Sequence, residues 1–248
     1  MSDMHDIEMN RETFWNLIAQ AKDKCGQDLE ASARWIKEQL LFMGAQQARD
    51  FHELVHAYRD HAMQFGVWSA ANLMCGGLSD DGFVDFCAWL VAQGKKTYLS
   101  ALADPDSLAE VERYGGCRFE SLVYLGDAAY EKLTGKSLYD APHQGSYRKM
   151  LSEIKEEAPL GEGINYPYST EEAAEYLPRL CAKYDVSATG TWNYDCTDIK
   201  HALKNEKKAA VSGIGVRPDE RADHHRRGSR LCRHEGRALL LPYRPRRP

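Results

Sequence analysis

The sequence predicts an all-α fold, and three observations carry that prediction. Apolar side chains recur every three or four residues along most of the first 185 positions, which is the spacing of one helix face. Capping residues and glycines stand at the ends of these periodic stretches. No alternation of apolar and polar residues long enough for a strand occurs before residue 185. We therefore expect a single multi-helix orthogonal or bundle-like domain of about seven or eight helices, followed by a disordered basic tail.

The first helices follow from capped, periodic stretches. Asn10 is a good N-cap for a helix that ends at Gly26. A second helix is expected from about Asp28 to Phe42, and a third, with the clearest apolar face, from about Ala45 to Phe65. Gly66 is expected to interrupt this third helix before the helical pattern resumes.

The segment GGLSDDGFVDFCAWL, residues 76–90, is the most orderly part of the pattern. Ser79 is expected to cap a new helix, with Asp80 and Asp81 in the first turn, where the helix dipole favours negative charge. The apolar face of this helix is formed by aromatic and aliphatic residues: Phe83, Phe86, Trp89 and Leu90.

Three further helices and one long loop are expected in the rest of the helical region. A short helix is expected over 97–103, ended by an Asp-Pro pair because the residue before proline avoids the α conformation. Residues 120–133 are predicted to be helical, and residues 136–168, rich in Gly, Pro and Tyr, to form an extended loop. A capping pattern near Thr170 opens one last helix, EEAAEYLPRLCAKY.

The charge of the chain changes sharply near its C-terminal end. Residues 1–210 carry 22 basic and 33 acidic side chains, whereas residues 211–248 carry 10 basic and 4 acidic ones. Dense positive charge is what a nucleic acid or an acidic membrane would require. The basic residues after 210 are all arginines and the tail contains LLLPY, which favours a disordered or frame-shifted segment instead. We therefore expect neither a membrane nor a nucleic-acid partner.

Cysteines and the N-terminus indicate the compartment and the domain boundaries. The seven cysteines are scattered without a CxxC pair, which favours reduced core thiols over a zinc knuckle. The polar, acidic start is not a signal peptide, so a cytoplasmic location is expected. We predict a flexible N-terminus over 1–8, a helical domain over 9–185, and a linker with an Arg/Pro-rich tail over 186–248.

The string HELVH matches the HExxH pattern of zinc peptidases, in which two histidines share a zinc ion and the glutamate is the general base. His52, Glu53 and His56 are therefore weak candidates for a metal site. The extended zincin pattern fails here, and the helical periodicity places both histidines with Arg49 and Arg59 on a face expected to be solvated. We predict no metal and no cofactor.

Asp80 and Asp81 offer a second place for chemistry. Paired acids beside a glycine turn can bind a divalent cation or act as an acid/base pair. The alternative is that Ser79 and the two acids cap the helix and complement its dipole.

Several stretches of the chain closely resemble the domain of unknown function 4240 family. They are FWNLIAQAK, the block from VWSAANLMC to LADPDSLAEV, ESLVYLGDAAYEKLTG and YLPRLCAKYD, and together they cover about residues 9–185. That family has no assigned activity, substrate or cofactor, so the resemblance implies no mechanism. The family usually has an arginine where this chain has Cys87. If that arginine pairs with the nearby acids, its loss leaves them less neutralised here.

Three functional hypotheses follow. The first is a binding or regulatory interaction module with an unknown protein or small-molecule partner. Its candidate surface combines residues of the resembling block: Trp68, Asp80, Asp81, Asp104 and Asp106. The second is a small enzyme, or a metal or nucleotide binder, that uses the acids around Asp80 and Asp81. The third is a zinc hydrolase at HELVH.

Overall fold

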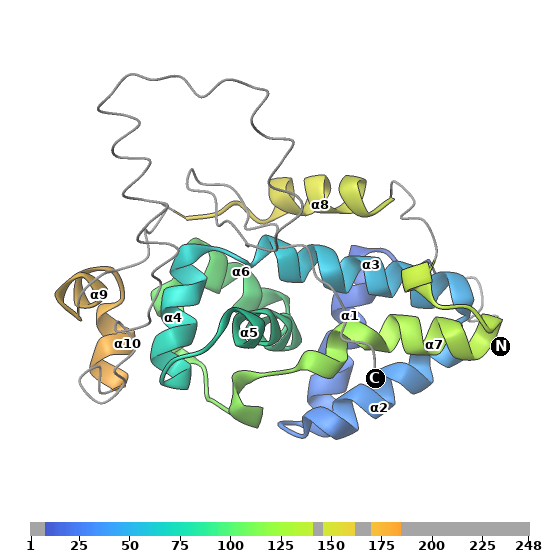
Figure 1. Cartoon of the computed structure of the whole chain (residues 1–248), viewed down its shortest axis with the longest axis horizontal. Coiled ribbons are helices and arrows are strands. Elements are labelled where there is room, and N and C mark those ends of the chain that lie inside the picture. Colours follow the sequence, from blue (N-terminus) through green and yellow to red (C-terminus); the bar gives the residue numbers. More distant parts are fainter. Residues whose placement is uncertain (1–7, 141–145, 162–169, 185–248) are drawn as a thin grey trace, which may run out of the picture. The chain divides into compact units, whose positions relative to one another are not determined.

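The computed structural model describes residues 8–140, 146–161 and 170–184. All of them lie in the first of two compact units, Met1–Trp192. Within these residues every regular element is a helix, which confirms the all-α fold class (Figure 1). Apart from Glu8, the predicted flexible N-terminus lies outside the described residues, and so does the Arg/Pro-rich tail.

Ten α-helices and four 3₁₀ helices make up the described region. The α-helices are α1 (Arg11–Cys25), α2 (Leu29–Met43), α3 (Ala45–His61), α4 (Phe65–Cys75), α5 (Asp80–Ala92), α6 (Lys95–Ala103), α7 (Leu125–Thr134), α8 (Ser146–Glu157), α9 (Thr170–Tyr176) and α10 (Pro178–Lys183). The 3₁₀ helices are η2 (Pro105–Glu110), η3 (Gly115–Cys117), η4 (Glu120–Tyr124) and η5 (Leu138–Asp140).

The predicted N-cap of the first helix, Asn10, is confirmed, and the structure shows that Asp28 caps the second helix in the same way. The Asn10 side chain accepts a hydrogen bond from the Thr13 amide at 3.0 Å. The Asp28 side chain does the same for the Ala31 amide at 2.9 Å. Each cap satisfies an amide that has no carbonyl partner within its own helix.

The break between α3 and α4 lies earlier than predicted. The third helix ends at His61, and the next begins at Phe65, so that Gly66 is a buried residue inside α4 and not the interruption. At the end of α3 the amide of Ala62 bonds back to the carbonyls of Tyr58 and Arg59, and the Gln64 side chain donates to the His61 carbonyl oxygen at 3.1 Å. A glycine inside a helix weakens it only modestly, so α4 tolerates Gly66.

The predicted extended loop over 136–168 is wrong in part, because α8 occupies Ser146–Glu157. The single last helix is also wrong: it is divided into α9 and α10 at Leu177. Leu177 has φ −133° and ψ 55°, since Pro178 follows it and excludes the α conformation.

Aromatic side chains from α1, α3 and α6 form the centre of the core. Trp15 donates its indole N–H to the Tyr58 hydroxyl at 2.9 Å, and the Tyr98 hydroxyl donates to the Tyr58 carbonyl oxygen at 2.7 Å. Phe14 stacks on Tyr58 with ring centroids 5.2 Å apart. The polar atoms of these large rings are therefore satisfied where they are buried.

Helix α3 is covered on more than one side. It contacts α1 and α5 in the core and also packs against α2, α7 and α8. Figure 1 shows α8 running along α3. A helix with this many neighbours must bury polar residues as well as apolar ones. His52 and His61 of α3 are among these polar residues.

Candidate functional site

The first turn of α5 has the geometry of a capped helix. The Ser79 hydroxyl oxygen accepts the Gly82 amide at 3.1 Å. Asp80 is half-buried and Asp81 is exposed, both at the positive end of the helix dipole. This supports the capping interpretation for Ser79, and a ligand role for the two acids stays a prediction.

A third acid on α5, Asp85, lies in a more negative environment. It is half-buried, and burial, Glu120 and Asp81 together raise its pKa to about 6, although Arg118 acts in the opposite direction. Arg118 also lies close to Gly82, 3.6 Å from where a Cβ atom would stand. The negative charge around Asp85 is therefore only partly compensated.

Asp104, the N-cap of η2, and Asp106, inside η2, hold a helix from far along the chain. Asp106 is buried and accepts three hydrogen bonds: its Oδ2 from the backbone N and Nε of Arg179, both at 3.0 Å, and its Oδ1 from the Leu180 amide at 2.9 Å. Asp104 Oδ2 lies 2.5 Å from Arg179 Nη2, and Glu110 Oε1 lies 3.2 Å from Arg179 Nη1. One arginine is thus surrounded by three carboxylates.

The same contacts start helix α10. The Asp106 carboxylate occupies the place of an N-cap for α10, although it comes from another element. Leu177 and Leu180 are fully buried around it. Lys183 adds a bond from its ammonium to the carbonyl oxygen of Ala109 at 2.6 Å. We define Asp104, Asp106 and Glu110 as the η2 acid cluster; it recognises an arginine at the start of a helical turn.

Trp68 does not lie on an exposed surface. Its side chain is buried and stacks on Phe83, with ring centroids 5.0 Å apart and planes 9° from parallel. Its role in the structure is packing between α4 and α5, which argues against including it in a partner surface.

The face of α3 that carries the histidines was expected to be solvated, but it is largely covered. His52, Arg59 and His61 are buried. The rings of His52 and His56 lie 4.2 Å apart, and Tyr139 of η5 packs edge-on against His52 at 5.3 Å. The helical period placed these residues on one face, but helices α7 and α8 cover that face.

A polar network missed by the sequence analysis lies on the same face. Arg59 donates from Nε and Nη2 to Asp60 Oδ1 at 2.8 and 2.5 Å, and the Tyr147 hydroxyl donates to Asp60 Oδ2. Arg49 donates to the Tyr130 hydroxyl at 2.9 Å. Tyr147 comes from α8, which was predicted to be loop, so no sequence signal pointed to this contact.

The described residues place no three His, Cys, Asp or Glu side chains where they could hold one metal ion. The HELVH histidines therefore have no third protein ligand among these residues. A small cavity of about 10 Å³ lies between α1, α2 and α5, beside Lys22, Tyr114 and Phe119. It holds roughly one water molecule, so it is too small for a substrate.

Cys87 is fully buried in the core. Burial raises the pKa of its thiol, and the charged groups that act on it are Arg59, Asp60 and Asp85.

No helix within the described ranges is both long and apolar enough to cross a bilayer. Comparison with curated proteins and with solved structures gave no match. A family model described as a protein of unknown function, DUF4240, matches residues 9–132, which is half of the 248-residue chain. This region contains helix α3, the first turn of α5 and the η2 acid cluster, while α8 and α10 lie beyond it. The chain therefore belongs to the DUF4240 family.

Proposed function

We propose that this chain is a binding module whose η2 acid cluster recognises a short helical protein segment with an arginine in its first turn. The observation that carries the proposal is the set of three hydrogen bonds that the Asp106 carboxylate accepts from Arg179 and Leu180. These hydrogen bonds contact both the guanidinium group of Arg179 and the backbone amides at the start of α10, which a single surface ion pair would not do.

The chemistry of the contact supports this specificity. Charged hydrogen bonds to a guanidinium are directional, and lysine cannot reproduce the planar arrangement of donors. The surrounding ion pairs to Asp104 and Glu110 are largely exposed, so they add little. Buried Asp106 and the apolar contact of Leu180 carry the recognition.

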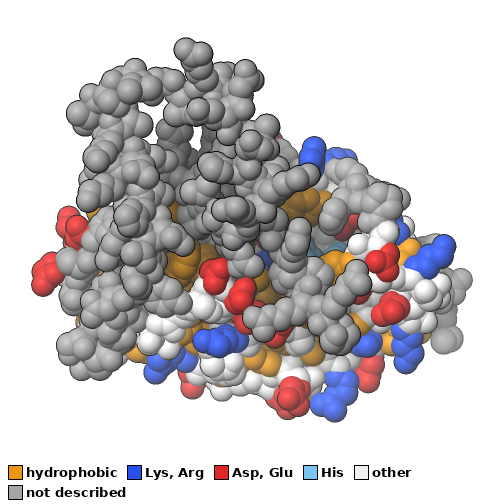
Figure 2. All heavy atoms as spheres, in the orientation of Figure 1, with side chains coloured by type: hydrophobic (Ala, Val, Ile, Leu, Met, Phe, Trp, Pro, Cys, Tyr) orange, Lys and Arg blue, Asp and Glu red, His pale blue; other side chains and the backbone are white. Residues whose placement is uncertain are grey.

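The charge of the family region favours a basic partner. Residues 9–132 contain 18 acidic and 12 basic side chains, a net charge of −6. In Figure 2 the acidic and basic side chains of the described residues are interspersed on the visible face, with no concentrated basic patch. Such a surface attracts arginine-bearing segments and repels polyanions.

The segment that the cluster holds in this chain comes from outside the matched region. Docking within one chain benefits from a high effective concentration, on the order of millimolar for a short connection. A separate partner must therefore displace α10. By competing with the partner for the η2 acid cluster, α10 regulates binding.

A peptide titration tests the proposal. The full chain with Arg179→Ala and Leu180→Ala vacates the cluster, and a fluorescent peptide of residues 170–184 is then added. We expect the double variant to bind this peptide at least tenfold more tightly than the unchanged chain, whose cluster is occupied. Fluorescence anisotropy gives both dissociation constants.

Two matched controls make the test specific. Adding Asp106→Asn to the double variant should weaken binding at least tenfold, and a peptide with Arg179→Lys should bind more weakly than the native peptide. Thermal unfolding confirms that each variant is folded. Equal binding with and without Asp106→Asn would disprove recognition by the cluster.

A ligand role for Asp80 and Asp81 is a second hypothesis, favoured by the partly compensated charge around Asp85. A thermal-shift screen with Mg²⁺, Ca²⁺ and Mn²⁺ tests it. A rise in melting temperature that is lost in Asp80→Asn/Asp81→Asn would support the hypothesis, and an unchanged rise would reject it. A cytoplasmic location likewise stays a prediction.

A further inference from the structure

Two cysteines that are 42 positions apart in the sequence meet in the fold. Cys75 is the last residue of α4, and Cys117 is the last residue of η3. The Cys75 thiol is hydrogen-bonded to the sulfur of Cys117. Both are free thiols; Cys75 is partly exposed and Cys117 is buried.

The backbone holds Cys75 firmly. The α4 helix ends in a left-handed glycine, Gly76, whose amide bonds to the Asn72 carbonyl oxygen, as does the amide of Gly77 at 2.9 Å. The buried Asn72 side chain also accepts the Leu78 amide at 3.2 Å. The end of the helix therefore presents Cys75 in one position.

Cys117 is placed by an unusual turn. Gly115, Gly116 and Cys117 have φ values of 58°, 63° and 54°, three successive left-handed residues. Glycine adopts this conformation freely, but for cysteine it is strained. The Cys117 amide bonds to the Tyr114 carbonyl oxygen at 2.9 Å. The backbone is therefore strained at Cys117, the residue whose sulfur meets Cys75. Such strain is common at functional positions.

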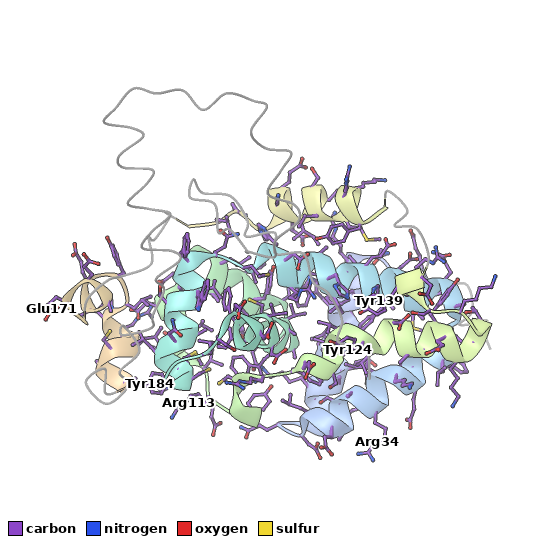
Figure 3. All side chains as sticks on the ribbon, viewed as in Figure 1. Arg34, Arg113, Tyr124, Tyr139, Glu171 and Tyr184 are labelled. Carbon is purple, nitrogen blue, oxygen red and sulfur yellow. The ribbon has the colours of Figure 1, made fainter. Side chains whose placement is uncertain are left out.

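Positive charge surrounds the pair. Arg113 donates to the Met74 carbonyl oxygen at 2.6 Å, directly beside Cys75, and its guanidinium lies 4.4 Å from the centre of the Tyr184 ring (Figure 3). The hydrogen bond from Cys75, together with Arg113, lowers the pKa of Cys117, whereas the same hydrogen bond and burial raise the pKa of Cys75. One sulfur is thereby favoured as thiolate and the other as the proton donor.

We propose that Cys75 and Cys117 form a reversible disulfide that joins the end of α4 to η3, with hydrogen peroxide as the oxidant. The Cys117 thiolate attacks one peroxide oxygen and breaks the O–O bond, and with one proton this gives a sulfenic acid and water. The Cys75 sulfur then attacks the Cys117 sulfur, and the departing hydroxide takes the Cys75 proton and leaves as water. Two thiols and one peroxide become one disulfide and two waters.

This modification site is independent of the proposed binding function, since neither sulfur contacts the η2 acid cluster in any described bond. A small neutral oxidant suits the site because Cys117 is buried. Reduction by a dithiol reverses the step through exchange at the partly exposed Cys75.

Mass spectrometry of the full chain tests the proposal. The reduced protein is treated with one equivalent of hydrogen peroxide, alkylated and digested. We expect a Cys75–Cys117 cross-linked peptide, which dithiothreitol removes. The melting temperature of the oxidised chain should rise by about 5 °C, because the bond closes a long loop.

Three variants control this experiment. Cys75→Ser and Cys75→Ala should each abolish the cross-link and the rise in melting temperature. They should leave a sulfenic acid at Cys117, which dimedone traps when the oxidised chain is unfolded in its presence. Cys25→Ser, on α1, should change neither result. The proposal fails if peroxide oxidises Cys25 before any cross-link forms, if the cross-link joins other cysteines, or if oxidation lowers the melting temperature.

Discussion

The charged Asp85 carboxylate lowers the stability of the folded chain. Its pKa is raised to about 6 by burial and by the neighbouring Glu120 and Asp81. The folded chain therefore binds a proton more readily at this position than the unfolded chain does. Stability is lost as the pH rises from about 4 to about 6, and above that range the charged carboxylate remains a cost.

Replacing Asp85 with asparagine removes this cost. We expect Asp85→Asn to raise the free energy of unfolding at pH 7 by about 1 kcal/mol, a value reduced for the partial exposure of the side chain. Near pH 4 the gain should vanish, because the native carboxyl is already protonated there. Urea unfolding at both pH values measures the difference.

Glu120→Gln is the matched control, since it removes one source of repulsion and leaves Asp85 in place. It should give a smaller gain with the same pH dependence. An equal gain from Asp85→Asn at pH 4 and pH 7 would show that packing, and not charge, is responsible.

Residue-scale prediction worked where the cause is local. Asn10 and Ser79 cap the helices predicted for them, because a cap needs only the three residues that follow it. The arginine that binds Asp106 is 73 residues further along the chain, and no local pattern at either position indicates the other.

At the scale of elements, the crossing of α7 over α3 depends on one glycine. A Cβ atom on Gly126 would lie 2.6 Å from the Ala48 carbonyl oxygen and 2.6 Å from His52 Cβ. These are backbone and near-backbone atoms, which cannot move aside without separating the helices. Helices α3 and α7 are therefore so close at this crossing that position 126 has no room for a side chain.

Gly126→Ala should consequently destabilise the chain by about 3 kcal/mol through overpacking. The matched control is Gly135→Ala at the end of the same helix, where a Cβ meets nothing within 4 Å but φ is +73°. This control should cost about 1 kcal/mol, from backbone strain alone. Urea unfolding of the two variants compares them, and equal losses would contradict the close crossing.

Element boundaries were predicted well where glycine or proline marks them. The ends of α1 at Gly26 and of α7 at Gly135 follow the sequence, whereas the end of α3 at His61 has no such marker. Helix α8 was missed because its neighbouring segments are rich in Gly, Pro and Tyr. Its apolar residues, Leu151 and Ile154, are buried only because α3 lies beneath them.

At the scale of the whole molecule, α8 docks on the polar face of α3. The Tyr147 hydroxyl bonds Asp60, and the His61 ring bonds the Ala158 carbonyl oxygen at 2.7 Å. Glu157 adds ion pairs to Lys95 and Arg11. The helix beyond the matched family region thus closes over buried polar groups of that region.

Tyr147→Phe should weaken this docking. Loss of the hydroxyl leaves one oxygen of Asp60 without its donor, which should lower the free energy of unfolding by about 1–3 kcal/mol. Hydrogen exchange at the amides of α8 should become faster. Tyr176→Phe on exposed α9 serves as the control and should leave exchange in α8 unchanged. Unaltered protection in Tyr147→Phe would show that apolar contacts alone hold α8.

The sequence by itself determined the all-α class, most helices, their local caps and the family. These properties arise from periodicity and from neighbours within one helical turn. Only the tertiary structure decided that the histidine face of α3 is buried, that Asp106 holds Arg179, and that Cys75 meets Cys117. Each of these depends on residues distant in the chain, whose approach is set by the packing of whole helices.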